Sequence, residues 1–117
     1  MSTIKNTREK LMETIKTKAL EHFKKLGLED EDAKELLEEG ADSIQSKIFL
    51  ISKTLKEENI EALIKLTHAI KGILLNLGLE EEATEFRKIK QLYEEGKSFK
   101  FIKEQTQKSL RKLIGKD

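Results

Sequence analysis

Apolar residues recur along most of this chain at the three- and four-residue spacing that is typical of amphipathic helices. The most regular stretch is residues 59–78. One side of its helix carries a stripe of small and aliphatic residues: Ala62, Leu63, Leu66, Ile70, Ile73, Leu74 and Leu77. Asn59 is a favourable N-cap and Gly78 a favourable stop. The pattern therefore predicts one amphipathic helix at the centre of the chain.

The same spacing predicts further helices on both sides of residues 59–78. The expected elements are residues 4–26, 28–40, 44–55, 59–78, 80–96 and 98–115. Asp30 or Asp32 is expected to cap the second element, and Ser98 the last. Gly40 is interpreted as a break, after which Asp42 or Ser43 starts a new helix. Every element is helical, so the expected class is all-α.

Composition narrows the class of protein further. The 117 residues correspond to one domain, 1–117, that is long enough to bury a single core. Charged residues make up 38% of a chain without proline or cysteine, which favours helices and excludes disulfides and thiolate metal sites. Uncharged runs are too short to cross a membrane, and residues 1–6 lack the apolar core of a signal peptide. We therefore expect a soluble, cytoplasmic protein.

The formal net charge is only +1, but it is spread unevenly. Residues 1–28 and 98–117 each carry +4, whereas residues 29–42 carry −7. The basic segments do not interleave aromatics with their charges, so solvated faces are favoured over a nucleic-acid or membrane partner. The acidic segment lacks the glycine and alternating ligands of a calcium-binding EF-hand loop. No metal site is expected.

The polar side of the central helix carries the candidate chemistry. His68 lies near the middle of this side, with Lys71 and Gly72 one turn further on. Glycine inside a helix costs about 1 kcal/mol relative to alanine, so a reason other than stability is expected for Gly72. Ile64 and Leu75 are apolar on the same outward side, as a docking surface requires.

These residue types suit a phosphoryl carrier. A neutral imidazole is a nucleophile near pH 7, and an adjacent ammonium offsets the charge of a phosphoryl group. The missing side chain at Gly72 leaves room for a partner protein to approach the ring of His68.

The run Thr67-His68-Ala69-Ile70-Lys71-Gly72, with Gly78 ten residues after the histidine, resembles the histidine phosphotransfer (HPt) domain family over residues 43–97. The resemblance implies an antiparallel four-helix bundle with an additional N-terminal or short connecting helix. It implies a phosphorelay role, with His68 as the phosphoacceptor, Lys71 and Gly72 assisting, and docking residues drawn from the same helix and its end: Ile64, Lys65, Leu75 and Gly78.

The partners implied by the resemblance are a response-regulator receiver domain, a sensor histidine kinase, or both. No cofactor is expected in this chain, which has no Gly-rich phosphate loop, and Mg²⁺ is expected only in the receiver domain. The chain departs from the family at residues 73–75, which are Ile-Leu-Leu where family members often have small residues.

An adaptor and an enzyme are the two alternative functions. An HPt-like adaptor that binds a signalling partner without phosphotransfer would keep the same residues, so whether the chain takes part in catalysis stays open. A hydrolytic or metal enzyme is disfavoured because the chain has only two histidines and no convergent pair of carboxylates beside either. His22, the second histidine, is expected to be a surface or boundary residue.

Overall fold

The computed structural model describes residues 6–115, which form five α-helices and no strand. The helices are α1 (Thr7–Lys25), α2 (Asp30–Lys56), α3 (Ile60–Asn76), α4 (Glu80–Glu94) and α5 (Phe99–Ile114). The all-α prediction is confirmed. Ile4, the expected start of the first helix, lies outside the described residues. Within them, α1 begins after Asn6, whose side chain accepts a hydrogen bond from the Glu9 amide at 2.8 Å.

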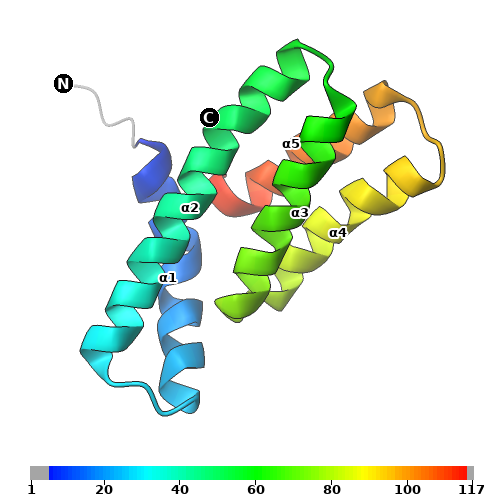
Figure 1. The fold of residues 1–117 in the computed structure, drawn as a ribbon. Coiled ribbons are helices and arrows are strands. Elements are labelled where there is room, and N and C mark those ends of the chain that lie inside the picture. The colour runs from blue at the N-terminus through cyan, green and yellow to red at the C-terminus, as the bar shows by residue number, and fades with distance from the viewer. Residues whose placement is uncertain (1–5, 116–117) are drawn as a thin grey trace.

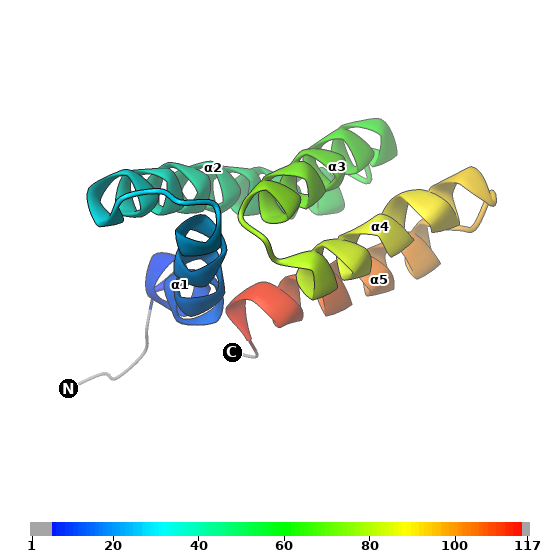
Figure 2. The ribbon, with the colours of Figure 1, turned by 90° about the horizontal axis from the view of Figure 1, so that it is seen from below.

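Turns of three or four residues join successive helices, and each helix packs against the next in the chain. The last helix, α5, returns to pack against α1 (Figure 1). Seen from below in Figure 2, α2 and α3 lie in one layer, while α4 and α5 lie in the other, with α1 beneath α2. The described chain is a flat helical bundle with principal extents of 45 × 40 × 18 Å.

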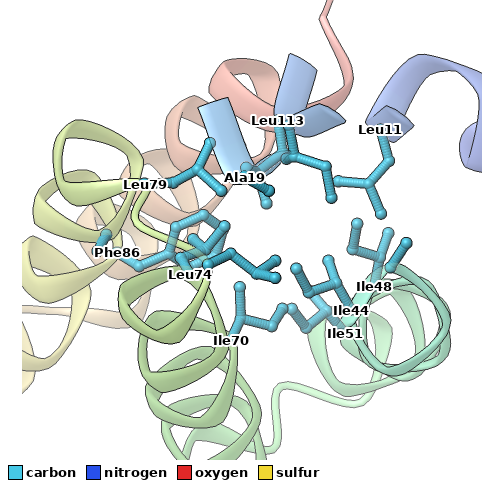
Figure 3. Close-up of a cluster of buried hydrophobic side chains, with 14 of the residues drawn as sticks. Leu11, Ala19, Ile44, Ile48, Ile51, Ile70, Leu74, Leu79, Phe86 and Leu113 are labelled. Atoms are coloured by element: carbon cyan, nitrogen blue, oxygen red, sulfur yellow. The ribbon is translucent and has the colours of Figure 1, made fainter. Parts of the chain in front are cut away.

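The core lies between these layers and receives side chains from all five helices (Figure 3). Its largest fully buried member is Phe86 of α4, and the same core includes Ile44 of α2, Ile70 of α3 and Leu113 of α5. Burying one such side chain contributes about 1.5–3 kcal/mol. The apolar stripes read from the sequence are therefore what holds the helices together.

The expected break at Gly40 is wrong, because α2 runs without interruption through this residue. A Cβ at Gly40 would lie 3.1 Å from Cδ1 of Leu77, which is buried in the turn after α3. Gly40 therefore allows close packing of α2 against that turn rather than ending a helix. The cap prediction also fails here, since the N-cap residue of α2 is Glu29 and its side chain makes no capping bond.

Side-chain ion pairs add two ties between helices. Lys18 of α1 pairs with Glu82 of α4, the Nζ and Oε2 atoms being 3.1 Å apart. The Glu82 side chain is almost fully buried, and its Oε1 has no hydrogen-bond partner among the described residues. Arg8 of α1 pairs with Asp42 of α2. Together these pairs fasten the N-terminal helix to both layers.

Candidate functional site

The histidine lies on α3, whose position is fixed by its caps and its packing. Asn59 caps α3 as predicted, its Oδ1 accepting a hydrogen bond from the Ala62 amide at 3.2 Å. Leu63, Ile70 and Leu74 are fully buried. Because α3 packs on α2 along one side and on α4 along the other, its rotation is fixed.

His68 is exposed, as the polar face of the helix predicted. The pKa of His68 is lowered from its ordinary value, and the largest contribution comes from the Lys71 ammonium on the same helix. Partial desolvation and the Lys90 ammonium on α4 lower it further. Both ammonium groups therefore favour the neutral imidazole, which is the form with a free nitrogen lone pair.

Lys90 is a site residue that the sequence analysis did not identify. The signal was present in the spacing. His68 lies ten residues before Gly78 and Lys90 lies twelve after it, so an antiparallel hairpin at this glycine brings the two together. The site therefore includes a cation from α4 as well as one from α3.

The backbone beside the ring is open. Gly72 is inside α3, and a Cβ placed on it would meet no other atom within 4 Å. No packing contact therefore explains this glycine, unlike Gly40. Leu75, two turns beyond His68 and one turn beyond Lys71, keeps 39% of its surface exposed. Lys65 is exposed as well, so this side of α3 presents both charge and apolar surface.

The expected exposure of Ile64 is wrong, because only 9% of its surface is accessible. Compared with the predicted apolar stripe, the buried face of α3 is rotated toward Ile64. It is centred on Thr67, which is 1% exposed. The Thr67 hydroxyl donates to the carbonyl of Leu63 at 2.9 Å, so its polar group is satisfied inside the helix. The apolar stripe read from the sequence does not include Thr67, and its centre lies about one residue away from the buried face.

The docking role expected for Gly78 has a structural alternative. Gly78 ends α3 as predicted, with a positive φ of 82° that favours glycine. A Cβ here would lie 2.5 Å from Cγ of His22, so the imidazole of α1 covers this turn. His22 is half-buried and its ring lies 5.6 Å from that of Phe23. The boundary position predicted for His22 is confirmed.

The structure thus gathers His68, Lys71 and Lys90 at the seam of α3 and α4, with Gly72 and Leu75 beside them. Two predicted docking residues lie apart from this group: Ile64 is part of the core, and Gly78 packs under α1. Among residues 6–115, no group of three or more His, Asp or Glu side chains converges to hold a metal ion. No helix in the same range is long and apolar enough to span a bilayer.

The chain matches no family model, and searches of curated proteins and of solved structures found no match. The resemblance to HPt domains therefore stays a prediction made from the residues around His68.

Proposed function

We propose that this chain is a phosphorelay carrier that accepts a phosphoryl group on His68 from an aspartyl phosphate of a receiver domain and passes it to another receiver. In this proposal α2 to α5 form an HPt-like antiparallel four-helix unit, with His68 on its second helix, and α1 is the additional N-terminal helix. The observation that carries the proposal is an exposed imidazole that has two ammonium groups near it and open backbone beside it.

The transfer step needs no cofactor from this chain. A nitrogen lone pair of the neutral His68 ring attacks the phosphorus, and a nitrogen–phosphorus bond forms. The phosphorus–oxygen bond to the aspartate breaks, and the carboxylate leaves as an anion. The return transfer to a second receiver reverses these changes, so the phosphoryl group and charge balance in each direction.

Lys71 and Lys90 serve this step in two ways. Their charges disfavour protonation of His68 before transfer, which keeps the nucleophile available. They also oppose the negative charge that arrives with the phosphoryl oxygens. A cation on each of two packed helices would hold that charge from two sides.

Gly72 and Leu75 fit the approach of a partner domain. The open space at Gly72 lets a surface loop come close to the ring of His68. Leu75 offers exposed apolar surface close by, which adds non-polar contact area around the charged centre.

The test is transfer from a phosphorylated receiver domain carrying ³²P on its aspartate. Label that is acid-labile, alkali-stable and bound at His68 is the expected result, and His68→Gln is expected to abolish it. His22→Gln is the matched control, because it makes the same change at the other histidine, and it should retain label. Circular dichroism checks that both variants keep their helices.

Absence of label from every receiver tested, with receiver binding retained, would replace this function by the adaptor role. Label that persists in His68→Gln would place the phosphoacceptor elsewhere and contradict the proposal.

A further inference from the structure

Two exposed helix faces of opposite charge lie on different parts of the bundle. The acidic ridge consists of Glu38, Glu39, Asp42 and Phe49, all exposed on α2. The basic ridge consists of Phe101, Lys108, Arg111 and Lys112, all exposed on α5. Each ridge therefore combines a cluster of like charges with one large apolar side chain. We infer that the acidic ridge of one copy of this chain binds the basic ridge of a second copy.

The charges on both ridges are largely unused within the molecule. Glu38 and Glu39 form no ion pair with another described residue, and neither do Arg111 and Lys112. Asp42 and Lys108 are the exceptions, because Asp42 already pairs with Arg8 and the Lys108 ammonium helps to lower the pKa of Glu85. Within residues 6–115 these charges therefore have no ion-pair partner, which leaves them available to ions or to a second molecule.

The exposed phenylalanines are the second observation. Phe49 is 78% exposed and Phe101 is 57% exposed, the two most exposed aromatic residues in the described chain. Leu50 adds apolar surface beside Phe49, with 44% exposed. A solvated charged face gains nothing from these side chains, whereas a contact between copies would bury them.

The spacing of the two ridges matches when the helices run antiparallel. Phe49 follows Asp42 by seven residues and Glu38 by eleven. Phe101 precedes Lys108 by seven and Lys112 by eleven. At about 1.5 Å per residue, each ridge therefore carries its charges about 10 and 16 Å from its phenylalanine. With the phenylalanines opposite each other, Asp42 faces Lys108 and Glu38 faces Lys112.

Surface hollows flank the basic ridge and suit protruding side chains. One hollow of about 470 Å³ is lined by residues that include Leu92, Phe101 and Lys108. A second, of about 940 Å³, lies around the C-terminal end of α5 and includes Arg111 and Lys112 in its lining. Their walls combine apolar and cationic groups, which matches an acidic helix that carries an aromatic side chain.

The arrangement of the layers decides the kind of assembly. In Figure 2, α2 and α5 belong to opposite layers, so the two ridges are separate surfaces on different parts of the bundle. A contact of α2 on α5 is then heterologous, with each copy offering one ridge to one neighbour and the other ridge to the next. The expected assembly is a head-to-tail chain of copies. A single helix-on-helix contact is smaller than the interface of a stable dimer, about 1,600 Å², so association should be weak.

The test is sedimentation velocity of the full chain over a range of concentrations. We expect a weight-average mass that rises with concentration in about 50 mM NaCl and falls back toward the monomer in about 500 mM NaCl, because screening weakens the charge pairs. The variants Glu38→Lys with Glu39→Lys, and Arg111→Glu with Lys112→Glu, should each lose association. A variant with Lys24→Glu and Lys25→Glu, which has the same net charge as the second, should retain it.

Mixing the two ridge variants in equal amounts is the decisive step. Each still carries one intact ridge, so the mixture should regain association although each variant alone does not associate. Three results would overturn the inference: a wild-type chain that stays monomeric throughout, ridge variants that associate like the wild type, or ridge variants that fail to recover on mixing. Binding of a DNA duplex to the basic ridge of a monomeric chain would assign that face to nucleic acid instead.

Discussion

Replacing Gly72 by alanine should stabilise the protein. Gly72 lies inside α3, where alanine is favoured over glycine by about 0.5–1 kcal/mol because the unfolded chain loses less backbone freedom on folding. The new methyl group would meet nothing within 4 Å, so no steric clash opposes this gain. For a chain of this size the gain corresponds to a rise in melting temperature of about 2–6 °C.

Gly40→Ala is the matched control, since it is the same substitution inside another helix. Its methyl group would lie 3.1–3.4 Å from three atoms of the Leu77 side chain, which must move to accommodate it. The helix-propensity gain should therefore be offset, and Gly40→Ala should be less stable than Gly72→Ala. Urea unfolding followed by circular dichroism at 222 nm measures both free energies.

The functional half of this prediction concerns Gly72→Leu. A leucine is nearly as good a helix former as alanine, so this variant should fold at least as stably as the wild type. Its side chain would lie beside His68, one turn away, and should slow phosphoryl transfer from the receiver. Loss of stability in Gly72→Ala, or unimpaired transfer in Gly72→Leu, would refute the reasoning that this glycine is kept for access to the ring.

Three further substitutions test the placement of individual residues. Lys71→Ala should raise the pKa of His68, measured by NMR titration of the ring protons, because it removes the ammonium that lowers this pKa most. In the wild type the pKa of His68 is lowered in the folded state, so the free energy of unfolding should decrease as the pH falls below the ordinary pKa of histidine. This pH dependence should weaken in Lys71→Ala. An unchanged titration of His68 would contradict the effect of Lys71 on its pKa. Gly78→Ala should lower the free energy of unfolding by about 2 kcal/mol or more, because φ is +82° at this residue and the new methyl group would collide with His22. In a double-mutant cycle, adding His22→Ala should recover part of this loss. Ile64→Ala should cost about 2–4 kcal/mol in urea unfolding, whereas a loss below about 0.5 kcal/mol would mean that Ile64 lies on the surface after all.

Periodicity predicted the helices well because each buries one continuous apolar stripe. The central helix, its Asn59 cap and its end before Gly78 are all confirmed. Gly40 could not be interpreted correctly, because its role depends on Leu77, a contact 37 residues away in the sequence. Treating a glycine as the end of a helix uses only neighbouring residues and takes no account of close packing between distant segments.

The candidate site was predicted in part for a similar reason. The exposure of His68 follows from one helix alone, and that prediction is confirmed. The burial of Ile64 and the position of Lys90 near His68 depend on how the helices pack together. A helical wheel of one segment does not contain this information. Thr67 lies at the centre of the buried face although it is polar, because its hydroxyl donates to a carbonyl of its own helix.

The most direct test of the proposed function is the rate of label transfer from a phosphorylated receiver to the wild type, to Lys71→Ala and to Lys65→Ala. Lys65 is an exposed lysine on the same helix that is not among the groups lowering the pKa of His68. The account predicts label on His68 of the wild type, markedly slower transfer to Lys71→Ala, and a smaller effect for Lys65→Ala. Equal slowing by both substitutions, or no label on His68 from any receiver, would contradict it.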